Sequence, residues 1–161
     1  MKTIVAAILL LPCCAFGQDE TAVSAAEGAC GPRAVQFKVT ADKSGHPTPI
    51  PENGKALIYV VQKDSATTRI GADGKWIGAA RRGTYFFASI DPGEHHLCAI
   101  GRIGLWSHVS LRELKAKAGE TYYFVAGGGE LLADDFTLNQ ADVDEGRHLV
   151  AFAHLSAFHP K

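Results

Sequence analysis

The chain has 161 residues, with 16 basic and 17 acidic side chains and a formal net charge of −1 at pH 7. This near balance excludes the broad basic surface that is typical of proteins that bind nucleic acid. The length favours a single domain, and no basic run indicates binding to an anionic membrane surface.

An export signal is predicted at residues 1–17. Lys2 precedes a short apolar run, and the segment Ala-Phe-Gly at 15–17 has the small-x-small pattern that signal peptidase reads. No apolar run is long enough to remain as a transmembrane segment, so we expect a periplasmic or secreted protein. Lipid attachment at Cys13 or Cys14 is the alternative, although the proline before Cys13 is a poor match for the small residue that this modification needs.

The next two segments are predicted to connect the signal to the folded domain. Residues 18–29 are small and polar and read as a flexible leader. Apolar and polar residues alternate at 33–39, which predicts a strand. Prolines and glycines follow and exclude a regular ladder. Residues 30–53 are therefore expected to hold an N-terminal strand and a proline-rich surface connection.

From Gly54 onward, short apolar runs alternate with turn signals, which is typical of a β-sandwich. A hairpin is predicted over 67–80, because Asp73-Gly74 suits a two-residue turn with positive φ at both positions. The segment 108–119 mixes the helical and strand periods, and its place between strands favours an extended conformation. The remaining predicted strands are 55–62, 83–90, 94–101, 121–127 and 136–140.

One helix is predicted at 142–154. Asp142 and Glu145 have the spacing of a capping box, and Gly146 costs the helix about 1 kcal/mol relative to alanine. The predicted buried face consists of Val143, Gly146, Val150 and Ala153. We therefore expect an all-β fold over 54–161, a small antiparallel β-sandwich of transthyretin-like or immunoglobulin-like architecture. The single C-terminal helix would cover an edge or an end of it.

Two cysteines, Cys30 and Cys98, remain after the export signal is removed. In an oxidising compartment they are expected to form one disulfide, and two buried free thiols are the alternative. A loop of roughly 70 residues closed in this way contributes about 4 kcal/mol in the chain-entropy model.

The segment PGEHHLC at 92–98 raises the question of a metal site. In a strand, His95 and His96 point to opposite faces, so they do not easily share one ion. His96 and Cys98 share a face and could bind zinc or copper with help from elsewhere. A disulfide at Cys98 would remove that thiolate, and the alternative is a strand with two polar contacts. We predict no cofactor.

Trp76 and Trp106 could stack on a sugar or another flat ligand, and core positions are the alternative for both. The glycine run at 127–129 lacks the following Lys-Ser/Thr of a phosphate-binding loop, and no G-x-S-x-G is present. The acidic residues at 134–145 serve turns and a helix cap as well as they would serve catalysis. The sequence therefore predicts that the protein is not an enzyme.

The region from Gly54 to Pro160 resembles a bacterial family, domain of unknown function 2846. The resemblance is carried by GKALIYV, DGKWIG, TYFFASIDPGEHHLCA, GETYYFV and DEGRHLVAFAHLS, and the P-G-x-H turn is also similar to PEGA-type surface domains. It implies an exported protein, often a lipoprotein, with a short sandwich fold and no assigned activity. The stretch ACGPRAVQFKV resembles a subset that pairs an N-terminal cysteine with EHHLC, which implies the Cys30–Cys98 bond.

Together these features predict a non-catalytic module that binds an envelope protein or a glycan. A periplasmic metal-binding protein that uses histidine and cysteine ligands is one alternative. A carbohydrate-binding module is the other.

Overall fold

The computed structural model describes residues 28, 30–64, 67–103, 106–128 and 136–161. The predicted export signal and all of the predicted leader except Gly28 lie outside the described residues. No helix in the described part of the chain is long and apolar enough to span a bilayer.

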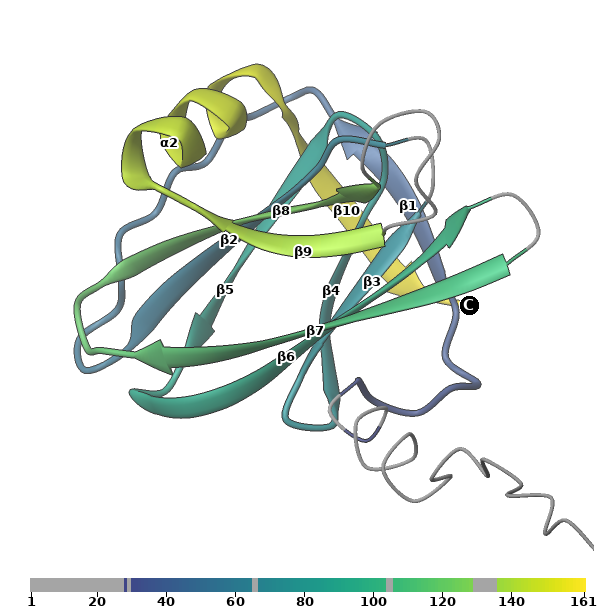
Figure 1. Ribbon diagram of the computed structural model, residues 1–161. Helices are drawn as coiled ribbons and strands as arrows, with labels where there is room; N and C mark the ends of the chain where they lie inside the picture. Colours follow the sequence, from purple (N-terminus) through teal and green to yellow (C-terminus); the bar gives the residue numbers. More distant parts are fainter. Residues whose placement is uncertain (1–27, 29, 65–66, 104–105, 129–135) are drawn as a thin grey trace, which may run out of the picture.

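The described strands form two sheets, as predicted for an all-β sandwich (Figure 1). The six-stranded sheet has the order β1-β10-β5-β2-β8-β9, and the four-stranded sheet has the order β4-β3-β6-β7. One short helix, α2 (Val143–Phe152), follows β9. The strands are β1 (Phe37–Asp42), β2 (Ala56–Gln62), β3 (Thr68–Ala72), β4 (Lys75–Ala80), β5 (Thr84–Ile90), β6 (Gly93–Ile103), β7 (Trp106–Ala116), β8 (Thr121–Gly128), β9 (Phe136–Ala141) and β10 (His154–Pro160).

The six-stranded sheet is mixed, whereas the sequence predicted antiparallel pairing throughout. β2 pairs antiparallel with β5 but parallel with β8, and β10 pairs parallel with β5. A parallel pair requires a long crossover connection. The connection between β2 and β8 is long, because it contains β5 and all strands of the four-stranded sheet.

β2 is buried along its whole length, as its nearly continuous apolar sequence predicted. One face packs into the core between the sheets, where Phe86, Phe124 and Ile70 are at most 1% exposed. The other face, which includes Leu57 and Tyr59, packs into a second cluster on the outside of the six-stranded sheet. The site described below lies on that outer face.

Side-chain hydrogen bonds join the two sheets on both sides of the sandwich. The Leu138 amide of β9 donates to Ser110 Oγ of β7 at 2.9 Å. On the opposite side, Ser156 Oγ of β10, the strand next to the edge strand β1, donates to the Ala79 carbonyl of β4 at 2.6 Å, and Ser156 is only 6% exposed. These two bonds connect the sheets to each other outside the apolar core.

Two predicted elements are correct in kind and one has wrong bounds. The Asp73-Gly74 turn has φ of 49° and 79°, as its predicted hairpin requires. β7 confirms the extended assignment of 108–119 as far as Ala116, and the chain then turns into β8. The first strand begins at Phe37, not at residue 33. Residues 33–36 instead lie against the four-stranded sheet, where Arg69 donates to the Arg33 and Val35 carbonyls.

The C-terminal helix ends earlier than predicted, and a strand follows it. Asp142 is the N-cap and accepts the Glu145 amide at 2.8 Å, as the capping signal indicated. Ala153 is extended, so the chain leaves the helix and forms β10 from His154. Val143 is 48% exposed and is therefore not part of the buried face, unlike the other three positions predicted for it.

The helix lies over the outer face of the six-stranded sheet, next to β2 and β8 (Figure 1), and does not cover a strand edge. Gly146 makes this close approach possible. A Cβ at that position would lie 2.1 Å from Tyr123 Cγ, so any larger residue would have to push the helix away from the sheet. The glycine that is unfavourable for an isolated helix is therefore required by the packing.

Candidate functional site

The two cysteines form the predicted disulfide. Cys30 and Cys98 are bonded, with Cα atoms 4.8 Å apart, and neither is more than 1% exposed. Gly71 of β3 lies beneath this crossing, because a Cβ there would approach the Cys30 carbonyl oxygen to 1.8 Å. The bond fixes the N-terminal segment to the outer face of the four-stranded sheet.

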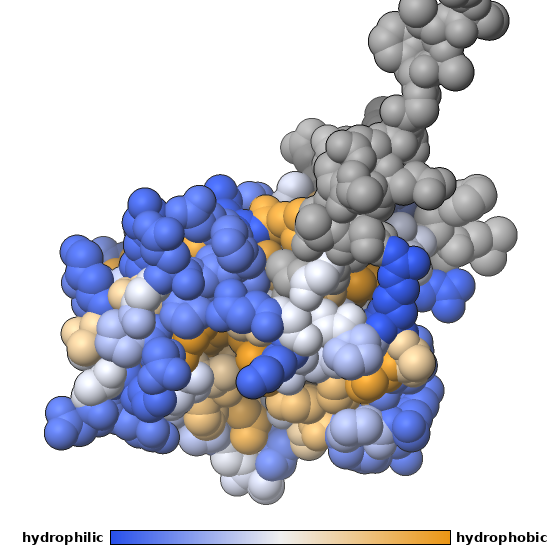
Figure 2. Space-filling model, turned by 90° about the horizontal axis from the view of Figure 1, so that it is seen from below, coloured by the Kyte–Doolittle hydropathy of each residue, from blue (hydrophilic) through white to orange (hydrophobic). Residues whose placement is uncertain are grey.

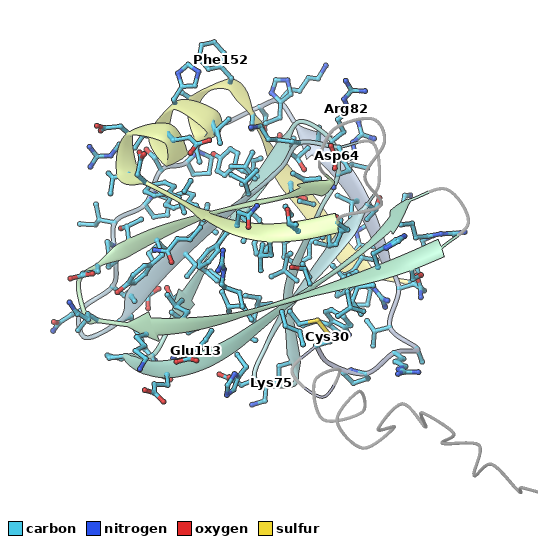
Figure 3. All side chains as sticks on the ribbon, viewed as in Figure 1. Cys30, Asp64, Lys75, Arg82, Glu113 and Phe152 are labelled. Atoms are coloured by element: carbon cyan, nitrogen blue, oxygen red, sulfur yellow. A yellow bond between two sulfur atoms is a disulfide. The ribbon has the colours of Figure 1, made fainter. Side chains whose placement is uncertain are left out.

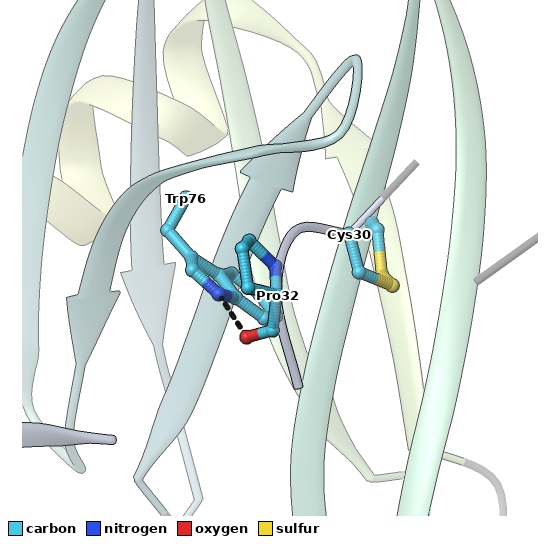
Figure 4. The surroundings of a disulfide bond; sticks show 4 residues. Cys30, Pro32 and Trp76 are labelled. Carbon is cyan, nitrogen blue, oxygen red and sulfur yellow. Dashed lines mark hydrogen bonds between the residues drawn. A yellow bond between two sulfur atoms is a disulfide. The ribbon is translucent and has the colours of Figure 1, made fainter. Parts of the chain in front are cut away.

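Trp76 lies beside the disulfide, and the N-terminal segment that follows Cys30 covers its ring (Figure 4). Its indole Nε1 donates to the Pro32 carbonyl at 2.9 Å. The Arg69 guanidinium lies 4.7 Å from the ring centroid, and Gly31 packs against the indole. The ring is thus already engaged by the chain, so a sugar would have to displace these contacts to stack there. The side chain of Trp106, the other predicted stacking residue, lies outside the described part.

The two histidines of PGEHHLC have different contacts. His95 Nδ1 is 2.6 Å from Asp73 Oδ2, and its Nε2 donates to the Asp91 carbonyl at 2.7 Å. His96 is exposed, and its backbone amide donates to Asp73. Because Cys98 is in the disulfide, a site built from His96 and Cys98 has lost its thiolate.

Metal binding finds no other support in the described ranges. No group of three or more His, Cys, Asp or Glu side chains is placed there to hold a metal ion.

His95 and Asp73 form a coupled pair at the β3–β4 turn. Burial alone would lower the pKa of His95, but its hydrogen bonds to Asp73 and the Asp91 carbonyl outweigh this effect and raise it. Burial would raise the pKa of Asp73, yet hydrogen bonds from His95 and the His96 amide lower it. The pair joins the β3–β4 hairpin to β6. These hydrogen bonds give both residues a structural role.

An apolar strip lies on the outer face of the β6–β7 hairpin. Val109 and Leu111 are 40% and 46% exposed, and they pair with Ile100 and Cys98 of β6. Figure 2 shows the molecule from the side on which Figure 3 places Cys30, Lys75 and Glu113. Apolar residues gather on this side among hydrophilic ones.

A cavity of about 350 Å³ lies on the outer face of the six-stranded sheet. Residues of the proline-rich segment 46–50 form one wall, and Arg147, Val150 and Ala151 of α2 form the other. The strands β2 and β8 supply the floor through Tyr59, Thr121 and Tyr123. This volume is at the lower end of the range of about 300–1,000 Å³ for small-molecule sites.

Three tyrosines pack under the proline-rich segment, and two of them hold it in place. Tyr59 Oη donates to the Pro49 carbonyl at 2.9 Å, and Tyr85 Oη donates to the Pro47 carbonyl at 2.8 Å. Burial, with the nearby Tyr123 and Tyr85, raises the pKa of Tyr59 to about 12, and burial also raises that of Tyr85. Both phenols therefore stay protonated at neutral pH and remain donors.

Tyr123 differs from these two tyrosines. Its ring stacks on Tyr59, with centroids 5.2 Å apart and planes 13° apart, and the residue is 8% exposed. Its hydroxyl has no hydrogen-bond partner among the described residues. The hydroxyl oxygen is not among the fully buried polar atoms of the described residues, and Tyr123 lines the cavity, so this hydroxyl is accessible to a molecule there.

The walls of the cavity carry a fixed histidine and a free cation. His46 Nε2 donates to the Val150 carbonyl at 2.8 Å, and its ring packs 5.1 Å from that of Tyr85. Arg147 is exposed on α2, and no ion pair or hydrogen bond joins it to another described residue. The histidine ties the proline-rich segment to the helix, while the guanidinium keeps its full hydrogen-bonding capacity.

Comparison of the chain with protein-family models, curated proteins and solved structures finds no match. The resemblance to domain of unknown function 2846 therefore stays a prediction.

No sequence motif pointed to His46, Tyr59, Tyr123 or Arg147 as site residues. A signal was present, because a tyrosine inside an apolar strand carries a hydroxyl that needs a partner. Tyr59 stands in such a run within β2, and Tyr123 does so within β8.

Proposed function

We propose that this protein is an exported, non-catalytic binding module of the bacterial cell envelope that holds a small molecule in the cavity between α2 and segment 46–50. The single observation that carries this proposal is the lining of the cavity. It combines a free guanidinium and an accessible phenol hydroxyl without a described partner with apolar walls. Such a mixture of apolar surface and a few convergent polar groups is typical of ligand sites.

Two further features support the proposal. A buried disulfide that closes a separation of 68 residues suits an oxidising compartment outside the cytoplasm. The described lining contains no carboxylate, and His46 already uses Nε2 to bind the Val150 carbonyl. The lining therefore lacks the acid–base pair that most hydrolytic chemistry needs, which favours binding over catalysis.

The experiment is to block the cavity and ask what small molecules are lost. Ala151 is exposed and lines the cavity, so Ala151→Trp would fill it. His148 lies on the same helix, does not line the cavity and is also exposed, so His148→Trp is the matched control. Each full chain is exported in a bacterial host, purified without denaturant and then unfolded, and the released small molecules are identified by mass spectrometry.

We expect the same compounds with the wild-type protein and His148→Trp, and strong depletion with Ala151→Trp. Equal recovery from all three proteins, or no compound from any, would refute the proposed site. Robust turnover of a substrate by the purified protein would refute the non-catalytic role.

A further inference from the structure

The cavity has a charge preference that follows from its lining. Arg147 is the only described lining residue with a permanent charge, and no described carboxylate pairs with it. A guanidinium presents a planar fork of donors that matches the two oxygens of a carboxylate or phosphate. A ligand that carries one such group would be bound more strongly than a neutral molecule of the same shape.

The lining also selects the rest of the ligand. Pro49, Ile50 and Val150 provide apolar contact on the two walls, and the stacked rings of Tyr59 and Tyr123 lie at the floor. Aromatic faces favour ring stacking or edge contact. The Tyr123 hydroxyl, which lacks a partner among the described residues, adds one hydrogen bond near these rings.

We infer that the cavity takes a small organic anion, with its carboxylate or phosphate on Arg147 and its ring or apolar body against the floor near Tyr123. The inference rests on the proposed function and adds to it the chemical class of the ligand. The cavity volume of about 350 Å³ matches a ligand of small-molecule size.

Three probes of one shape test the inference on the full exported chain. These are 4-hydroxyphenylacetate, its neutral amide and 4-hydroxyphenyl phosphate, titrated by calorimetry and by NMR of labelled protein. We expect the amide to bind the wild-type protein about ten- to a hundred-fold more weakly than the better of the two anions. The order of the two anions tells a carboxylate ligand from a phosphate ester.

Four variants separate the roles of the residues. Arg147→Gln should abolish the preference for the anions, whereas Arg82→Gln, on an exposed turn that does not line the cavity (Figure 3), should leave it unchanged. Tyr123→Phe should weaken all three probes about three- to ten-fold without changing the melting temperature of the free protein. Tyr59→Phe should lower that temperature, because it breaks the bond to Pro49.

Three outcomes would overturn the inference. These are equal binding of acid and amide to the wild-type protein, an unchanged anion preference in Arg147→Gln, and no binding of any probe at millimolar concentration. If compounds are nevertheless lost from Ala151→Trp, the proposed function stands and only the ligand class is wrong. If Ala151→Trp loses none, the proposed function itself fails.

Discussion

Replacing Gly146 by alanine tests the packing of α2 on the sheet. In an exposed helix this change stabilises by about 1 kcal/mol. Here the new Cβ would lie 2.1 Å from Tyr123 Cγ and 2.4 Å from Tyr123 Cβ. These atoms are the base of a buried ring, so the ring or the helix must move. Overpacking of this kind costs about 1–3 kcal/mol, and the upper end applies. We expect Gly146→Ala to lose a net of about 2 kcal/mol.

Urea unfolding of the wild-type protein and Gly146→Ala, analysed by linear extrapolation, measures this difference. His148→Ala is the control, because it improves helix propensity on the exposed side of the same helix and meets only Phe152. It should change stability by no more than about 0.5 kcal/mol. A Gly146→Ala protein that is more stable than the wild type would refute the close helix–sheet contact, and with it the position of Tyr123 in the cavity floor.

Three other outcomes are expected. Changing both Cys30 and Cys98 to alanine should lower the free energy of unfolding by up to about 4 kcal/mol, and the wild-type intact mass should be two protons lighter than that of its reduced form. The pKa of His95 is raised above 6.5, so its stabilising bond to Asp73 is fully present below pH 6.5 and is lost as the pH rises through the raised value. Urea unfolding from pH 6 to 9 should therefore show a fall in stability that His95→Gln lacks. Ser156→Ala should cost about 1–3 kcal/mol by the same assay, because it leaves a carbonyl of β4 without its partner.

The fold could be predicted where local signals were strong. The Asp-Gly turn, the buried run of β2 and the capping residue Asp142 all lie where the sequence placed them. β10 was missed because residues 155–160 carry no local strand signal that was recognised, and pairing with β1 and β5, which lie far away in the chain, makes them a strand. The mixed pairing was missed for a related reason. Whether β8 runs beside β2 is decided by contacts between segments far apart in the chain.

The candidate site depends on long-range contacts even more strongly than the fold does. Arg147 lies on a helix and Tyr123 on a strand, so no local sequence pattern connects them. They line one cavity because Gly146 allows α2 to pack closely against β8. The proline-rich segment had been interpreted as a surface connection, yet Tyr59 and Tyr85 hold its carbonyls and His46 joins it to the helix. A proline has no amide hydrogen but keeps its carbonyl, so a segment that cannot join a ladder can still accept these phenols. The same property that excluded 46–50 from a strand allows it to form the wall of the cavity.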